Sequence, residues 1–360
     1  MKKTAAVGMS GGVDSSVCAY LLKEAGYDII GVTMQIWQDE TQDEIQDNGG
    51  CCGLSAVEDA RAVCARLGIP HYVLNFKSEF KKYVIDYFTA EYLKGRTPNP
   101  CIACNRYVKW QALLNRAVAV GADYIATGHY AKVGIYPKTG RYSLHLANTS
   151  TKDQTYALYS LTQEQLSRTL MPVGEYDKNQ IRKIAEKIGL AVANKPDSQD
   201  ICFVPDGDYG RFIRENTDKE IPEGNFVSPE GEILGRHKGI TNYTLGQRKG
   251  FGLSFKTRMY ITEIRPETNE IVLDQNAKLF KSVVEIDDFN FMGIEDIKEP
   301  LRAEGKLRYS QKASPCTIYK KGGRIIAEFD EPQRAPTPGQ AAVFYDDGYI
   351  LGGGTIIKSE

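Results

Sequence analysis

The segment Ser10-Gly11-Gly12-Val13-Asp14-Ser15 constrains the fold of this chain more than any other feature. It follows the largely apolar residues 5–9 and precedes a helix-like pattern from Val17 to Leu22. A glycine-rich turn between a strand and a helix presents backbone N–H groups and the positive end of the helix dipole to an anion. We therefore expect residues 10–15 to bind phosphate groups, with the serine hydroxyls as donors and Asp14 placed for Mg²⁺ or the phosphate chain.

This loop is not a Walker loop, because no G-x-x-x-x-G-K-[ST] pattern occurs in the chain. Its S-G-G-x-D-S pattern resembles the pyrophosphate loop of ATP pyrophosphatases. Those enzymes cleave ATP to AMP and pyrophosphate in order to adenylate a carbonyl oxygen. The alternative interpretation is a serine-capped glycine turn without a ligand.

The composition is that of a globular chain with more than one domain. It has 360 residues, of which 42% are hydrophobic and 25% charged, a length that predicts two or three domains. No run of 18 apolar residues exists, and Met1-Lys2-Lys3 leads directly to the phosphate loop instead of a signal-peptide core. We expect a cytoplasmic protein whose eight cysteines are thiols and not a disulfide scaffold.

Basic residues are unevenly distributed, although the formal net charge is only −1. Residues 94–116 hold five Lys or Arg and no acid, residues 235–258 hold six and none, and residues 301–324 hold seven with one acid. Such segments can follow a phosphate backbone. The alternative is three solvated faces with compensating acids nearby in space.

The first two hundred residues alternate strand and helix patterns, which predicts an α/β fold with a Rossmann-like doubly wound parallel sheet. Prolines predict no regular structure from Arg96 to Asn105. A capping box of Ser55 and Glu58 predicts the start of a helix that runs through Leu67. The expected strands are 28–34, 71–76 and 123–129, and the expected helices are 55–67, 80–93, 109–120 and 177–188.

The character of the sequence changes near Phe203, where glycine and proline turns begin to separate short alternating runs such as 259–264 and 270–273. This is typical of β-barrels or sandwiches. We therefore predict a catalytic domain over 1–203, a small β-rich central domain over 204–276 and a C-terminal β-barrel over 277–360.

Two cysteine segments do not look like core packing. Cys104 lies next to prolines and asparagines, and Cys202 ends a polar run that contains Asp197 and Asp200. Buried structural cysteines usually sit within apolar runs, so both thiols are expected on exposed loops at a site. Cys18, Cys64 and Cys316 lie in apolar or strand-like contexts and are expected to pack.

The motifs S-G-G-V-D-S, R-T-P-N-P-x-x-x-C-N, A-T-G-H-Y, K-D-Q, D-S-Q-x-I-C-F and G-Q-R-K-G follow one another along the whole chain. In this order they resemble the tRNA-specific 2-thiouridylase family. The resemblance implies an ATP pyrophosphatase domain, a central tRNA-contacting domain and a C-terminal barrel. It also implies ATP with Mg²⁺ as cofactors, tRNA as partner, and replacement of the C2 oxygen of the wobble uridine by sulfur in tRNAs for Lys, Glu and Gln.

The resemblance further implies the roles of the thiols. Cys202 matches the cysteine that carries a persulfide, and Cys104 matches the nucleophile that releases the sulfur and leaves a transient Cys104–Cys202 disulfide. A cysteine desulfurase or a sulfur-relay protein is the implied donor. Such chemistry first needs ATP, because a uridine carbonyl is a poor electrophile until its oxygen becomes part of an AMP leaving group.

Cys101 departs from the family pattern, which has an aspartate at this position. Cys101 and Cys104 form C-x-x-C, and with Cys202 they would supply three thiolates. Three cysteines with one open iron position would suit a [4Fe–4S] cluster that activates sulfide. The persulfide and cluster routes both stay open, and so does the role of Cys51 and Cys52, whose adjacency suits one metal poorly.

The resemblance also assigns binding positions. Its ATP contacts match Gly8, Met9, Ser10, Gly11, Gly12, Val13, Asp14, Ser15, Met34 and Gly128. Its tRNA contacts match Asn99, Pro100, Cys101, His129, Lys152, Asp153, Gln154, Arg308, Tyr309 and Gln340. For Met34 the alternative is a core residue, and for His129 it is a capped core histidine.

Two other function classes share the phosphate loop. An adenylating ligase or amidotransferase, such as argininosuccinate or GMP synthetase, has no need of Cys104 and Cys202 or of three basic segments. An RNA-binding module with a vestigial nucleotide fold would be expected to lack Asp14 or the loop glycines, which are present. Sulfur transfer to tRNA accounts for all of these features.

Overall fold

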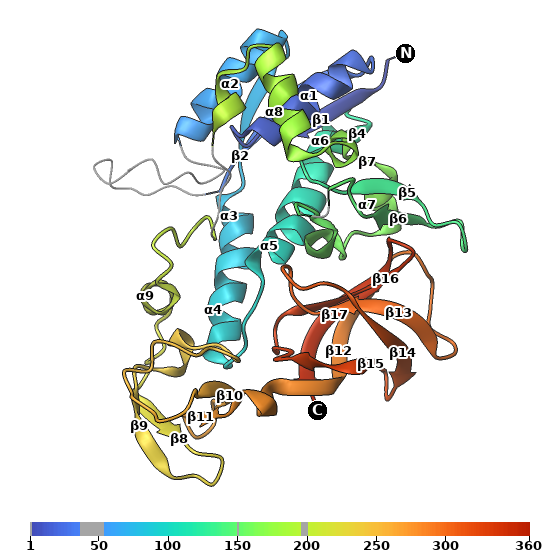
Figure 1. Cartoon of the computed structure of the whole chain (residues 1–360). Helices are drawn as coiled ribbons and strands as arrows, with labels where there is room; N and C mark the ends of the chain where they lie inside the picture. The colour runs from blue at the N-terminus through green and yellow to red at the C-terminus, as the bar shows by residue number, and fades with distance from the viewer. Residues whose placement is uncertain (1, 37–53, 150, 196–200) are drawn as a thin grey trace. The chain divides into compact units, whose positions relative to one another are not determined.

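The structure is a computed structural model that describes residues 2–36, 54–149, 151–195 and 201–360 (Figure 1). They form two compact units, each assembled from separate stretches of the sequence. The first unit takes in Met1–Val84, Cys101–Gly207 and Asp347–Ile350, and the second takes in Ile85–Pro100, Asp208–Asp346 and Leu351–Glu360. The predicted domain boundaries at residues 203 and 276 stay predictions.

The first unit is built on a parallel five-stranded sheet of order β3-β2-β1-β4-β7. Its strands are β1 (Thr4–Gly8), β2 (Asp28–Gln35), β3 (His71–Asn75), β4 (Tyr124–Ala126) and β7 (Thr169–Leu170). This confirms the predicted Rossmann-like sheet. The order changes direction between β1 and β4, and the carboxyl ends of parallel strands at such a switch point are where α/β proteins bind ligands.

Helices α1 (Val13–Glu24), α2 (Leu54–Leu67) and α8 (Lys178–Lys187) share one core cluster with β1 (Figure 1). Cys18 and Cys64 are buried in this cluster, as expected for packing residues, and burial raises the pKa of Cys64 to about 11. One expectation was wrong here. Helix α2 begins at Leu54, so Ser55 lies in its first turn and not before it.

A helical stretch joins β3 to β4. It consists of α3 (Lys77–Phe80), the π-helix η1 (Lys81–Ile85), α4 (Asp86–Leu93), α5 (Pro100–Ala103), the π-helix η2 (Cys104–Leu113) and α6 (Leu114–Ala119). The expectation of irregular backbone as far as Asn105 was wrong, because a helix begins at Pro100. Proline is tolerated in the first turn of a helix, where its missing N–H would have no intrahelical partner.

The remaining elements of the first unit are short. They are the hairpin β5 (Lys132–Ile135) and β6 (Tyr142–His145), helix α7 (Gln163–Ser167), and the 3-10 helices η3 (Thr155–Leu158), η4 (Pro172–Glu175) and η5 (Ala191–Asn194). Capping boxes open two of the helices: Thr162 with Gln165 opens α7, and Asp177 with Gln180 opens α8.

The second unit contains a four-stranded sheet of order β10-β11-β8-β9. Its strands are β8 (Gly224–Val227), β9 (Ile233–His237), β10 (Tyr260–Arg265) and β11 (Glu270–Asp274). The same part of the chain carries α9 (Tyr209–Glu215), η6 (Ile240–Asn242) and η7 (Asn276–Leu279). Phe226, Tyr243 and Phe251 pack edge-on or tilted in its core.

The second unit also contains a six-stranded β-barrel (Figure 1). Its strands are β12 (Phe280–Phe291), β13 (Leu301–Lys306), β14 (Ser314–Lys321), β15 (Arg324–Arg334), β16 (Ala341–Asp346) and β17 (Tyr349–Ser359). The barrel closes because β12 pairs with both β15 and β17. Cys316 is buried inside it, as expected, and burial raises its pKa to about 12. Among the described residues, no helix combines the length and the apolar character that a membrane crossing requires.

Candidate nucleotide and thiol site

The phosphate loop runs from the end of β1 to the start of α1 and is held by its own residues. The Ser10 amide donates to Ser15 Oγ at 3.2 Å, and Ser15 Oγ donates to the Gly12 carbonyl at 3.1 Å. Gly11 has a φ of +67°, and a Cβ there would lie 2.5 Å from the Ala56 carbonyl oxygen. A side chain at this position would therefore strain the turn and collide with α2.

Asp14 is fixed by two residues that the sequence interpretation missed. Lys178 Nζ lies 2.8 Å from both carboxylate oxygens of Asp14, and the Tyr130 hydroxyl donates to Oδ1 at 2.7 Å. Only 13% of the Lys178 side chain is exposed. The one sequence signal for Lys178 is a cation in the first turn of a helix, directly after the cap Asp177, where the helix dipole disfavours positive charge unless an anion lies nearby.

Gly128 packs directly on this loop. A Cβ at Gly128 would lie 2.5 Å from the Ser15 amide nitrogen and 2.6 Å from the Asp14 carbonyl carbon. The chain leaving β4 therefore presses against the start of α1 at the switch point. Met34 is half-buried at the carboxyl end of β2, whereas Met9 and Val13 are buried and offer a ligand only their backbone.

His129 is held from two sides. Thr127 Oγ1 hydrogen-bonds its Nδ1 at 2.7 Å, and the Trp110 ring lies 5.5 Å away between centroids. Burial, helped by the charge of Lys109, lowers the pKa of His129 well below its ordinary value, so the imidazole is neutral at pH 7. Within the described residues its Nε2 forms no hydrogen bond, which leaves that atom for a ligand.

Residues 152–154 shape the loop that follows the β5–β6 hairpin. Asp153 accepts from the Ala147 amide at 2.9 Å and from the Thr155 amide and hydroxyl. Gln154 pairs with the backbone of Tyr130 in both directions, each bond measuring 2.9 Å. Both side chains thus have structural roles, while Lys152 is half-buried.

The site cysteines differ in their surroundings. Cys202 is exposed in irregular backbone, as expected, and Cys101 is exposed in α5. Cys104 is half-buried at the first residue of η2, so its expected placement on an exposed loop was wrong. Its neighbour Asn105 is buried and donates to the Ala157 carbonyl at 2.9 Å, which anchors this end of the helix.

The segments that contain Cys104 and Cys202 both border helix α3. Phe203, next to Cys202, packs edge-on against Phe80 of α3 with centroids 5.7 Å apart, and α3 also packs against η2, which starts at Cys104. Across the described residues, no three His, Cys, Asp or Glu side chains are placed to hold a metal ion. The three thiols therefore do not form a cluster site in this arrangement, and Cys51 and Cys52 lie outside the described residues.

In the second unit, Gln340 supports the loop that contains Asn99. Gln340 Nε2 donates to the Thr97 carbonyl at 2.8 Å and to the Pro98 carbonyl at 3.4 Å, and the Thr97 amide donates to the Pro338 carbonyl at 2.9 Å. Pro100 is buried at the end of this loop.

Arg308 and Tyr309 sit together at the end of β13. The Arg308 guanidinium donates to the Ala335 carbonyl at 2.6 Å and to Thr337 Oγ1 at 3.0 Å, while 43% of Tyr309 is exposed. Arg308 therefore braces a turn of the barrel, at which Ala335 has a φ of +49°.

A parallel sheet whose first strand leads through S-G-G-V-D-S into a helix defines a nucleotide-binding domain of the ATP pyrophosphatase type. The family described as tRNA methyl transferase HUP domain matches residues 3–206. The tRNA methyl transferase PRC-barrel domain matches residues 210–275, and the aminomethyltransferase beta-barrel domain matches residues 281–356.

Two curated relatives extend over the whole chain. The tRNA-specific 2-thiouridylase MnmA of Lachnoclostridium phytofermentans is 60% identical over 99% of this chain and 100% of its own length. The protein of the same name from Clostridioides difficile is 55% identical over 100% and 99%. A solved 4-thiouridine synthetase–RNA complex with bound ATP is 17% identical, with a TM-score of 0.37, over 59% of this chain and 53% of that one. The chain belongs to the tRNA-specific 2-thiouridylase family, a family of tRNA sulfurtransferases.

Proposed function

We propose that this enzyme uses ATP to replace the C2 oxygen of the wobble uridine in tRNAs for Lys, Glu and Gln by sulfur. The observation that carries the proposal is one compact unit that holds both a rigid phosphate loop around Asp14 and the thiols Cys104 and Cys202. A ligase or amidotransferase would need the loop alone. Both relatives that match over their full length are named tRNA-specific 2-thiouridylase, which agrees with the reaction proposed here.

In the first step, the uridine O2 attacks the α-phosphorus of ATP and pyrophosphate leaves. The amides and hydroxyls of residues 10–15 hold the phosphates, and Lys178 adds a positive charge. The Asp14 carboxylate is the kind of oxygen ligand that Mg²⁺ takes together with phosphate oxygens and water, so the residues fit this ion. Mg²⁺, when bound, neutralises the charge of the leaving pyrophosphate.

In the second step, the terminal sulfur of a persulfide on Cys202 attacks C2, and AMP leaves with the former O2. The Cys104 thiolate then attacks Sγ of Cys202. The sulfur–sulfur bond of the persulfide breaks with its electron pair on the sulfur at C2, and a Cys104–Cys202 disulfide forms. A dithiol reductant restores both thiols, and a cysteine desulfurase or sulfur-relay protein reloads Cys202.

No step is assigned to a [4Fe–4S] cluster, because Cys101, Cys104 and Cys202 are not grouped as ligands. The test is the iron content and the 2-thiouridine yield of Cys101→Ser, prepared without oxygen. We expect substantial thiolation without iron, whereas Cys104→Ser and Cys202→Ser each stop thiolation but still release pyrophosphate. Cys316→Ala, which removes a buried thiol of the barrel, is the control. Loss of iron and activity together in all three serine variants would replace the persulfide route by the cluster route.

A further inference from the structure

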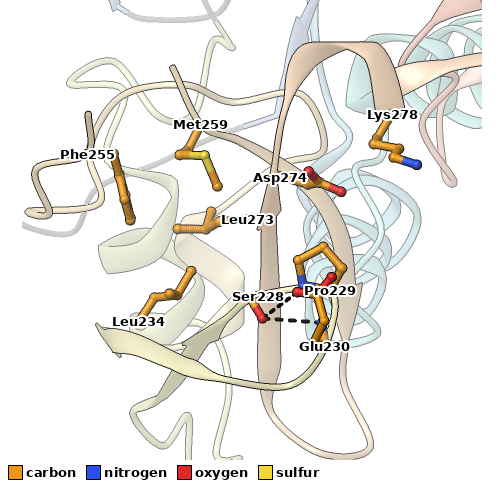
Figure 2. Close-up of a pocket in the computed structure, with 9 residues that line it drawn as sticks. All are labelled: Ser228, Pro229, Glu230, Leu234, Phe255, Met259, Leu273, Asp274 and Lys278. Atoms are coloured by element: carbon orange, nitrogen blue, oxygen red, sulfur yellow. Dashed lines mark hydrogen bonds between the residues drawn. The ribbon is translucent and has the colours of Figure 1, made fainter. Parts of the chain in front are cut away.

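A cavity of about 580 Å³ lies in the four-stranded sheet part of the second unit and belongs to neither the phosphate loop nor the thiols. Figure 2 shows its lining divided into two sides. The apolar side consists of Leu234, Phe255, Met259 and Leu273, and the polar side includes Asp274 and Lys278. A cavity of this size has room for a nucleobase with its ribose.

The apolar side suits a flat unsaturated group. Leu273 is buried, while Phe255 and Met259 are half-buried against the domain core. In the part of the chain that the structure describes, no other aromatic ring packs against Phe255. An aromatic ring beside a polarisable thioether is a stacking surface that accepts any base.

The polar side offers a carboxylate acceptor. Asp274 Oδ1 accepts the Gln275 amide at 2.6 Å, and over the described residues its second carboxylate oxygen forms no hydrogen bond. The other acid of this side, Glu230, already accepts from Ser228 Oγ at 2.9 Å. A carboxylate in such a pocket selects a base that carries an exocyclic amino group.

The loop that leads into the cavity is positively charged. Its ends are tied together, because the Gly246 amide donates to the Ile261 carbonyl at 2.8 Å and the Ile261 amide donates to the Gln247 carbonyl at 3.0 Å. Between these ends, the exposed cations are Arg248, Lys249, Lys256 and Arg258, and none of them forms an ion pair with any described residue. In the sequence, Lys256 and Arg258 lie between Phe255 and Met259, which both line the cavity.

In the other two basic segments, ion pairs take up part of the charge. In residues 94–116, Lys94 and Arg96 both pair with Glu91, and Arg116 pairs with Glu79. In residues 301–324, the paired cations are Arg302, Lys320 and Arg324. The loop 248–258 contains no acid and its four cations are exposed, so its charge is available to a polyanion.

We propose that this cavity, together with the loop 248–258, binds one unstacked nucleotide of the tRNA substrate, with a base that carries an exocyclic amino group. The base stacks on Phe255, Asp274 accepts from its amino group, and Lys256 and Arg258 contact the flanking phosphates. Unpaired RNA bases are recognised in this way, by stacking and by hydrogen bonds to their edges. The proposal rests on the proposed function, because tRNA is the ligand.

The test measures binding of an unmodified tRNA transcript to the full chain across a salt series, together with thiolation with cysteine and a cysteine desulfurase as the sulfur source. Phe255→Leu keeps the apolar packing but removes the stacking face, and we expect about tenfold weaker binding. Asp274→Asn is expected to weaken binding severalfold. Lys256→Ala is expected to reduce the slope of log K against log salt by about one, whereas Lys298→Ala, an equal loss of exposed charge in the same unit, leaves the slope unchanged.

A second measurement does not depend on lost affinity. Phe255→Trp preserves a stacking ring, and we expect its fluorescence to be quenched when the tRNA binds. If the wild type thiolates tRNA while Phe255→Leu binds it normally and Phe255→Trp is not quenched, the cavity proposal is wrong and the proposed function stands. If Phe255→Leu binds tRNA and releases pyrophosphate normally but no longer thiolates tRNA, the cavity is a docking site for the protein sulfur donor and the nucleotide proposal is wrong. A wild type that neither binds nor modifies tRNA overturns the proposed function itself.

Discussion

The phosphate loop and the loop 96–100 are both expected at the substrate, yet they are held in opposite ways. The phosphate loop closes on itself through Ser10, Gly12 and Ser15, which are at most five residues apart. The loop 96–100 is fastened by Gln340, whose amide bonds Thr97 across 243 positions of sequence. Substitutions within the phosphate loop should therefore disturb its conformation, whereas the loop 96–100 should also be disturbed by a substitution at a remote residue of the barrel.

The two loops also differ in the kind of interaction that holds or acts in them: Asp14 carries a charge, whereas Gln340 is neutral. Asp14 brings a carboxylate that Lys178 and Tyr130 hold in place, so its replacement removes a charge from the phosphate loop. Gln340 brings two neutral hydrogen bonds to a backbone, so its replacement loosens a position. Losing charge stabilisation in a transition state costs more than losing one support of a loop.

The largest expected effect is that of Asp14→Asn. The amide cannot offer the anionic ligand that Mg²⁺ and the phosphate chain require, so tRNA-dependent pyrophosphate release is expected to fall about a hundredfold to a thousandfold. Binding of tRNA, measured separately by filter binding, is expected to stay within about twofold, since other surfaces carry it. Wild-type pyrophosphate release by this variant would contradict the assignment of the loop.

Gly128→Ala is expected to come next. The new Cβ would lie 2.5 Å from the Ser15 amide nitrogen and 2.6 Å from the Asp14 carbonyl carbon. Because backbone at both contacts cannot rotate away, the loop must shift, and a shift near 1 Å costs about a hundredfold in rate. The control is Gly134→Ala, where the nearest atom is 3.7 Å away. Equal ATP affinity and pyrophosphate release in both variants would show that the loop tolerates movement.

Gln340→Glu tests the other region. The carboxylate keeps the size of the amide but cannot donate to the Thr97 and Pro98 carbonyls. We expect kcat for thiolation to fall about tenfold, because the loop 96–100 loses its support. The affinity for ATP should not change, since the phosphate loop is not affected. Gln163→Glu, which disturbs a similar glutamine clamp on the backbone of Tyr142, is the control. A uniform loss of stability in both variants would mean that Gln340 acts on folding alone.

The smallest expected effect is on the pH dependence of stability. Burial lowers the pKa of His129 well below 6.5. Below pH 6.5, this histidine is therefore protonated in the unfolded chain but stays neutral in the folded chain. The unfolded state then binds more protons, and the free energy of unfolding falls as the pH drops. His129→Asn should flatten this dependence, which denaturant unfolding at pH 7.5, 6.5 and 5.5 will measure. Parallel profiles for both proteins would place the titration at His71 or His237, whose pKa values burial also lowers.

Local patterns in the sequence suffice to predict the parallel sheet, the phosphate loop and the C-terminal barrel. In these regions the signals are local. Strand period, glycine conformational freedom and serine hydroxyls act over a few residues, so a short pattern specifies the shape. The burial of Cys18, Cys64 and Cys316 also followed from their apolar neighbours in sequence.

Which residues support these local structures depends on the tertiary fold. Lys178 meets Asp14 across 164 positions and Gln340 meets Thr97 across 243, and no periodicity reports such a pairing. Cys104 is half-buried at the start of a helix because Asn105 is anchored 52 positions away at Ala157. Likewise, the ion pairs in two of the three basic segments mostly join residues that are distant in sequence. Local propensity sets the elements, whereas charge pairing and burial depend on which elements the packed core brings together.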